Sequence, residues 1–107
     1  MRASLLRLFR VVGYSARGFA SAEEFLGSDA LQSCRCAITD VQMAGISGIK
    51  LSEHLSRRES PVPVIIITAR TEDRLKQEAL ASGALCFLTK PIDTDALLQC
   101  VERAVNV

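Results

Sequence analysis

The 107-residue sequence has no tryptophan and a single tyrosine, Tyr14, and aromatic residues make up only 5% of it. A flavin or another flat ring would therefore find little to stack on in this chain. The sequence also lacks a glycine-rich loop of the kind that cradles nucleotide phosphates. These two absences argue against a flavin carrier or a flavin-dependent enzyme.

The chain has no excess of one charge sign, because 13 Lys and Arg residues face 12 Asp and Glu residues, for a net charge of +1. Such a balance gives no electrostatic reason for direct binding to nucleic acid or to a membrane surface. The apolar runs are far too short to span a bilayer. Arg2 and Arg7 interrupt the region that would be apolar in a signal peptide. We therefore expect a cytoplasmic protein that contacts neither nucleic acid nor membrane directly.

The four cysteines give little support for a metal site. Cys36, Cys86 and Cys100 lie in apolar segments, where a free thiol behaves as a small hydrophobic side chain. Cys34 and Cys36 form a single C-x-C pair, and His54 is the only histidine. Zinc sites usually combine two pairs of ligands, so we expect free cysteines without metal and a surface position for His54.

Apolar periodicity predicts helices that alternate with strands along the whole chain. A nearly continuous β-branched run over 62–67 is typical of a strand buried on both faces. Ser21 and Glu24 form a capping box at the start of a short helix. This alternation predicts a parallel α/β sheet with right-handed crossovers. The helices are expected over 5–12, 21–27, 48–57, 72–82 and 94–105, and the strands over 14–19, 35–39, 62–67 and 85–88.

Three polar side chains follow three of these predicted strands. Asp40 follows the strand over 35–39, Thr68 follows the strand over 62–67, and Lys90 comes just after the strand over 85–88. Ligands of open parallel sheets bind beyond the carboxyl ends of the strands, so this edge is the expected site. A carboxylate can attack phosphorus to form an aspartyl phosphate. A lysine and a hydroxyl could then stabilise the added negative charge.

Three segments resemble the motifs of bacterial response-regulator receiver domains. Residues 40–48 are similar to the loop after the phosphoacceptor strand, residues 66–69 to the Thr-Ala switch segment, and residues 83–91 to the segment that ends in Lys-Pro. Residues 14–26 resemble the subgroup of nitrogen-fixation regulators, whose receivers are joined to helix-turn-helix output domains. The resemblance implies a signalling switch of a two-component system and not an enzyme.

The resemblance also implies a role for each matching residue. Asp40 would accept a phosphoryl group from a sensor histidine kinase, and Lys90 would pair with that group. Thr68 would turn its hydroxyl toward the phosphoryl group, and the rotamer of Phe87 would follow. Asp40 and the backbone carbonyl of Gln42 would be ligands of Mg²⁺.

Receiver domains have a flavodoxin-like, doubly wound sheet in the order 2-1-3-4-5, and their first strand ends in an acidic pair that holds Mg²⁺. This sequence opens inside the helix that follows that strand. The resemblance therefore implies an N-terminally truncated receiver over residues 1–107, with an incomplete sheet of four strands that lacks the first, central strand. Because Mg²⁺ requires several oxygen ligands, we expect it to bind weakly or not at all.

The gap allows two interpretations. Either the gene start or the sequence boundary is misplaced, or the chain is a degenerate receiver. In the second case it would act as a phosphorylation-independent interaction module, through a face formed by the helix over 72–82, the strand with Phe87 and the helix over 94–105. The same face is the expected route to an output domain, on this chain or another, and to a homodimer.

Overall fold

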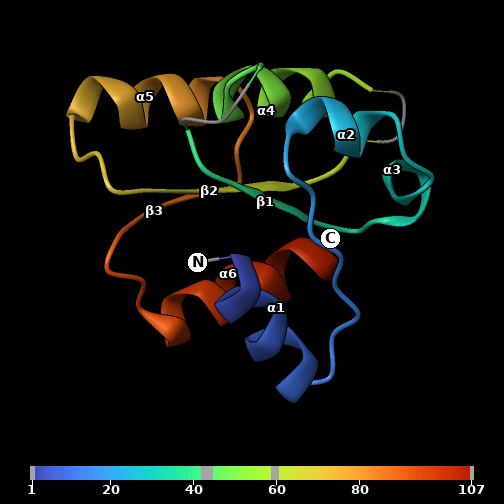
Figure 1. Ribbon diagram of the computed structural model, residues 1–107. Helices are drawn as coiled ribbons and strands as arrows, with labels where there is room; N and C mark the ends of the chain where they lie inside the picture. The colour runs from blue at the N-terminus through green and yellow to red at the C-terminus, as the bar shows by residue number, and fades with distance from the viewer. Residues whose placement is uncertain (1, 42–44, 59–60, 107) are drawn as a thin grey trace.

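The computed structural model describes residues 2–41, 45–58 and 61–106, and it is an α/β fold (Figure 1). The elements in chain order are α1 (Arg2–Val11), α2 (Ala22–Leu26), α3 (Ala30–Ser33), β1 (Ala37–Thr39), α4 (Gly48–Ser56), β2 (Val64–Thr68), α5 (Asp73–Ala81), β3 (Cys86–Thr89) and α6 (Thr94–Val105).

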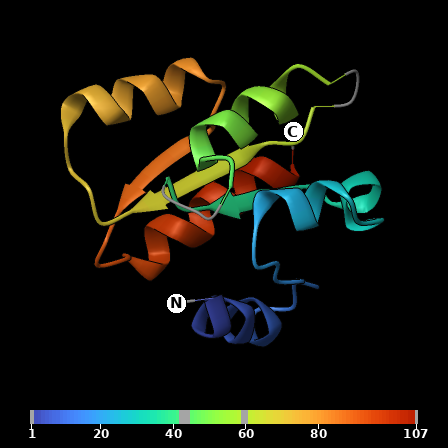
Figure 2. The same cartoon turned by 45° about the horizontal axis from the view of Figure 1, so that its top comes forward.

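The three strands form one parallel sheet in the order β1-β2-β3. Figure 2 shows them side by side and pointing in the same direction. Ile38 of β1 pairs with Ile65 of β2, and Ile65 pairs in turn with Cys86 of β3. Helices α2, α4 and α5 cover one face of the sheet, and α1 and α6 cover the other (Figure 1). The predicted parallel α/β sheet is thus confirmed.

The central strand β2 divides the core into two parts, because successive side chains of a strand point to opposite faces. Val64 and Ile66 enter the α4-side core, which comprises Ala22, Phe25, Ala30, Val41, Leu51, Leu55, Val62, Val64, Ile66, Ala79 and Ala84. Ile65 and Ile67 enter the α6-side core, which comprises Phe9, Ile65, Ile67, Cys86, Leu97, Cys100 and Val101. Every residue of β2 is buried, as the β-branched run predicts.

The predicted strand over 14–19 is wrong, because this segment is irregular and links α1 to α2. A strand needs a neighbour to satisfy its backbone N–H and C=O groups. In the described part of the chain the sheet consists of β1, β2 and β3, and none of these strands pairs with this segment. Side chains hold the segment instead: the Phe9 and Tyr14 rings meet edge to face, and Arg17 pairs with Asp29.

The start of α2 follows the predicted capping signal. The Ser21 hydroxyl accepts a hydrogen bond from the backbone N–H of Glu24 and so caps α2, as the capping box predicts. The Ser47 hydroxyl caps α4 in the same way, by accepting from Lys50. The short helix α3 was not predicted, because its four residues are too few to show a helical period.

The cysteines differ from the expectation of free thiols. Cys86 of β3 and Cys100 of α6 form a disulfide bond with their Cα atoms 6.4 Å apart, whereas Cys34 and Cys36 are free. No local pattern in the sequence predicts this pairing, since the two residues are 14 positions apart and meet only in the folded chain. No helix in the described part of the chain is long and apolar enough to cross a membrane.

Candidate functional site

Asp40 directly follows β1, at the carboxyl end of the sheet. Its side chain is 24% exposed, so it is accessible but largely surrounded by protein. Its backbone carbonyl accepts a hydrogen bond of 3.0 Å from the Thr39 hydroxyl. Gly48, the first residue of α4, passes so close to this carbonyl that a Cβ there would collide with it. The backbone around Asp40 is therefore fixed from two sides.

Lys90 follows β3 and reaches across the end of the sheet to Asp40. Its Nζ lies 3.0 Å from Oδ2 of Asp40, and the Lys90 side chain is 32% exposed. The backbone N–H of Lys90 donates to the carbonyl of Thr68 over 2.8 Å, which ties the end of β3 to the end of β2. The ammonium is thus held beside the carboxylate by the backbone as well as by charge.

Thr68 is the last residue of β2 and pairs in register with Thr89. Its side chain is almost completely buried, with 1% of the residue exposed. Its hydroxyl oxygen accepts a hydrogen bond of 3.2 Å from the backbone N–H of Arg70. The predicted hydroxyl therefore lies at the same sheet edge as Asp40 and Lys90, in a position fixed by the loop that follows β2.

Phe87 lies in the middle of β3, opposite Ile66 in the register of the sheet. It is partly buried and packs against the α4-side core, whereas its neighbour Cys86 belongs to the α6-side core. Strand β3 thus carries residues into both cores and continues directly to Lys90. A movement of this strand would therefore change the side-chain packing on both faces of the sheet.

Metal ligands are scarce near Asp40. Gln42, whose carbonyl is a predicted Mg²⁺ ligand, lies outside the described residues. Among the residues that are described, no group of three or more His, Cys, Asp or Glu side chains could hold a metal ion. Mg²⁺ prefers a near-octahedral shell of hard oxygen ligands, which Asp40 alone does not supply. The described donors therefore do not fit a complete Mg²⁺ site.

The sequence analysis missed one residue of this region, Glu23 of α2. Its carboxylate oxygens accept hydrogen bonds of 3.3 and 3.4 Å from the backbone N–H of Ile46, in the loop between Asp40 and α4. Gly45 adjoins this contact with φ +79°, and a Cβ there would collide with the Glu23 carboxylate. The contact could not be predicted from the sequence, because its partners are 23 residues apart and meet only in the folded chain.

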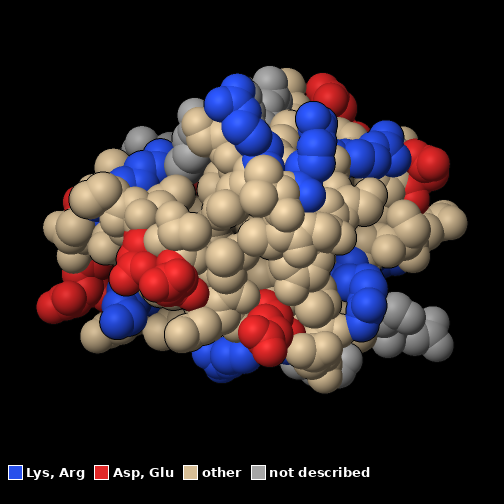
Figure 3. Space-filling model, turned by 90° about the horizontal axis from the view of Figure 1, so that it is seen from below, with Lys and Arg blue, Asp and Glu red and all other residues tan. Residues whose placement is uncertain are grey.

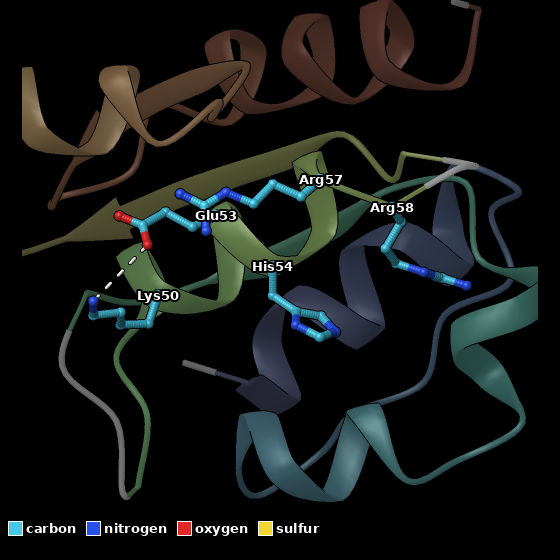
Figure 4. A pocket seen from close by; sticks show the side chains of 5 residues that line it. All are labelled: Lys50, Glu53, His54, Arg57 and Arg58. Atoms are coloured by element: carbon cyan, nitrogen blue, oxygen red, sulfur yellow. Dashed lines mark ion pairs between the residues drawn. The ribbon is translucent and has the colours of Figure 1, made fainter.

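A separate hollow of about 350 Å³ lies on the outer side of α4 (Figure 4). It is lined by Lys50, Glu53, His54, Arg57 and Arg58, with Lys50 Nζ 3.9 Å from a Glu53 carboxylate oxygen. His54 is exposed, as predicted, and none of the sheet-edge residues lines the hollow. On the side of α1 and α6, acidic and basic side chains are interspersed around a centre of other residues (Figure 3).

The sheet edge offers an accessible carboxylate paired with an ammonium, next to a buried hydroxyl. A carboxylate so placed can act as a nucleophile toward phosphorus, and a lysine beside it can balance the charge of the product. Comparison with known proteins gives the family to which the chain belongs.

Over residues 1–102 the chain matches the response regulator receiver domain family. The transcriptional regulatory protein FixJ of Bradyrhizobium diazoefficiens is 35% identical over 106 residues, which are 99% of this chain and 52% of FixJ. Nodulation protein W of the same organism is 36% identical over 106 residues, which are 99% of this chain and 47% of that protein. The chain thus spans about half the length of these relatives.

Solved structures of response regulators have the same fold as this chain. The response regulator StyR superposes with a TM-score of 0.86 at 32% identity, over 98% of this chain and 53% of StyR. The crystal structure of FixJ-N superposes with a TM-score of 0.85 at 29% identity, over 98% of this chain and 84% of that one. The flavodoxin-like fold is therefore confirmed, and the chain belongs to the family of response regulator receiver domains.

Proposed function

We propose that Asp40 accepts a phosphoryl group from a sensor histidine kinase in the cytoplasm. The observation that carries this proposal is the contact of 3.0 Å between Lys90 Nζ and Asp40 Oδ2 at the carboxyl end of the sheet. Receiver domains of response regulators are phosphorylated by such kinases, and relatives of this chain carry output domains. Asp40 combines a position at the end of a strand with a lysine partner.

In the proposed reaction, a carboxylate oxygen of Asp40 attacks the phosphorus of a phosphohistidine. The bond between phosphorus and the histidine nitrogen breaks, and its electron pair stays on the imidazole, which takes up a proton. Phosphoryl transfer depends mainly on position and charge stabilisation. Lys90 supplies the stabilisation, because its ammonium already lies beside the Asp40 carboxylate.

Thr68 and Phe87 would transmit the effect of Asp40 phosphorylation to the rest of the domain. The Thr68 hydroxyl accepts a hydrogen bond from Arg70. To donate a hydrogen bond to a phosphoryl oxygen, this hydroxyl would have to turn, and the loop after β2 would move with it. Phe87, half-buried on β3, would then change its rotamer and alter the face formed by α5, β3 and α6. This face is the proposed route to an output domain and the proposed surface of a homodimer.

Mg²⁺ is the usual partner of this chemistry in receiver domains. Asp40 and the carbonyl of Gln42 are the residues of this chain proposed to contact the ion. Two such ligands leave most of the octahedral shell to water, so weak binding is expected. The proposed roles of Asp40, Lys90, Thr68 and Phe87 do not depend on a step through the metal.

The test is phosphorylation of the full chain by acetyl phosphate in the presence of Mg²⁺, followed by intact mass spectrometry. The wild-type chain should gain one phosphoryl group, and Asp40→Asn should gain none. Asp73→Asn is the matched control, because Asp73 is an exposed aspartate in the first turn of α5. Label that persists in Asp40→Asn would refute the proposal. An unlabelled wild-type chain whose partner binding is unchanged by Asp40→Asn would point to a phosphorylation-independent interaction module.

A further inference from the structure

The bond between Cys86 and Cys100 joins β3 to α6 within the α6-side core. Cys86 is the first residue of β3, and Cys100 lies in the middle of α6. The bond therefore closes a loop that contains the end of β3, Lys90 and the first half of α6. A cross-link at this point restrains how far α6 can move relative to the sheet.

The pair is buried in an apolar part of the core. Cys86 is 7% exposed and Cys100 is 8% exposed, and both belong to the same core as Leu97 and Val101. Two free thiols at these positions would pack as small hydrophobic side chains. Their Cα separation of 6.4 Å lies within the usual range for disulfides, so the bond can form without a shift of the backbone.

A basic side chain lies next to one of the two sulfur atoms. Nη1 of Arg103 is 3.9 Å from Sγ of Cys86, and Arg103 itself is an exposed residue of α6. A guanidinium beside a sulfur favours the thiolate, which is the form that attacks and leaves in disulfide exchange. Cys86 is itself buried, so a small opening of α6 is needed to give a reagent access to it.

We propose that Cys86 and Cys100 form a redox modification site, which interconverts between a dithiol and a disulfide by exchange with a small disulfide of the glutathione class. In the oxidising direction, the Cys86 thiolate attacks one sulfur of the glutathione disulfide, and one glutathione thiol leaves. Cys100 then loses its proton, attacks the Cys86 sulfur, and displaces the second glutathione. Two protein thiols are oxidised, and one glutathione disulfide is reduced to two thiols.

In the disulfide form a covalent bond joins α6 to β3, whereas in the dithiol form only side-chain packing holds the two elements together. Strand β3 also carries Phe87 and leads to Lys90, so the bond acts on the part of the fold that borders Asp40. Backbone amides of α6 should therefore exchange hydrogen faster in the dithiol form. This inference does not rest on the proposed function, because thiol exchange can be measured whether or not Asp40 accepts a phosphoryl group.

The chain offers its own control for the experiment, because Cys34 and Cys36 are free and lie in the loop between α3 and β1. The double variant Cys34→Ser/Cys36→Ser retains the pair alone and would be equilibrated at graded ratios of reduced to oxidised glutathione. After an acid quench, denaturation and N-ethylmaleimide treatment, intact mass should change in one transition from two labels to none, without bound glutathione. Two labels at every ratio, no label at every ratio, or a stable glutathione adduct would each overturn the proposal.

Two further variants test the assigned roles. Cys100→Ser in this background should trap glutathione on Cys86, and no adduct would contradict its role as the attacking thiol. Arg103→Gln should slow reduction of the bond by about fivefold, because a unit charge at this distance is worth that factor in water. Arg57→Gln, which removes an exposed arginine of another helix, should leave the rate unchanged. Equal rates for both arginine variants would refute the role of Arg103.

Discussion

The ammonium of Lys90 lies 3.0 Å from a carboxylate oxygen of Asp40, although 50 positions separate the two residues in the chain. The contact exists because β1 and β3 are parallel to β2 and end at the same edge of the sheet. Both side chains are partly exposed, at 32% and 24%, so water screens the pair. We therefore expect it to matter more for chemistry than for stability.

Lys90→Ala should abolish or strongly slow phosphorylation by acetyl phosphate, because the new negative charge would lose its counter-charge. The free energy of unfolding should fall by about 1 kcal/mol or less, as is usual for exposed ion pairs. Urea unfolding and intact mass spectrometry measure the two effects. Lys76→Ala, at an exposed lysine of α5, should change neither. Wild-type labelling of Lys90→Ala would contradict the assigned role.

Gly48→Ala should distort the loop that carries Asp40. A Cβ at Gly48 would collide with the backbone carbonyl of Asp40, and backbone cannot move aside as a side chain can. We expect a loss of about 1–3 kcal/mol in the free energy of unfolding, as for other overpacked sites. Gly27→Ala is the control, because its Cβ would lie 3.4 Å from the Glu23 carbonyl, at ordinary contact distance. Equal stability of the two variants in urea unfolding would show that the loop has room.

Ile66→Val should lower the free energy of unfolding by about 1 kcal/mol, because it removes one methylene group from a fully buried site. Ile66 is 0% exposed and lies in the α4-side core opposite Phe87. Val11→Ala removes apolar atoms from a residue that is 79% exposed, and its effect should stay within about 0.5 kcal/mol. Urea unfolding of both variants measures the difference. A loss of unfolding free energy in Ile66→Val no larger than that in Val11→Ala would contradict the prediction.

Cys36 should make stability depend on pH in the alkaline range. Burial, with a smaller contribution from Cys34, raises the pKa of Cys36 from 9.0 to about 12. The thiol of the unfolded chain ionises first, so the stability that Cys36 contributes is complete below pH 9 and is lost between pH 9 and about 12. Urea unfolding below and above pH 9 should show a smaller decline for Cys36→Ala than for the wild type. Equal declines would mean that the thiol is not shielded from water.

The sequence predicted the parts of the site that depend on local pattern. Asp40, Thr68 and Lys90 each follow an apolar strand, and a parallel sheet brings such positions to one edge. The structure places them there, with Lys90 bonded to Asp40 through its side chain and to Thr68 through its backbone. Their roles in phosphoryl transfer stay predictions until the labelling experiment is done.

Contacts between distant elements could not be predicted in this way. The bond between Cys86 and Cys100 and the contact of Glu23 with Ile46 both depend on how two elements pack, and no local pattern encodes that. The strand predicted over 14–19 did not form for a related reason. Its composition allows a strand, but a strand forms only where a neighbour satisfies its backbone groups.

The sequence by itself determined the alternation of strands and helices from β1 onward, the strand buried on both faces and the three polar residues at the strand ends, because these follow from periodicity and chain order. Only the tertiary structure decided that Lys90 reaches Asp40, that Gly48 leaves no room at the Asp40 carbonyl, and that Cys86 meets Cys100. The physical reason is that such contacts require the packing of the whole sheet against its two helical layers, which fixes distances that the chain order leaves free.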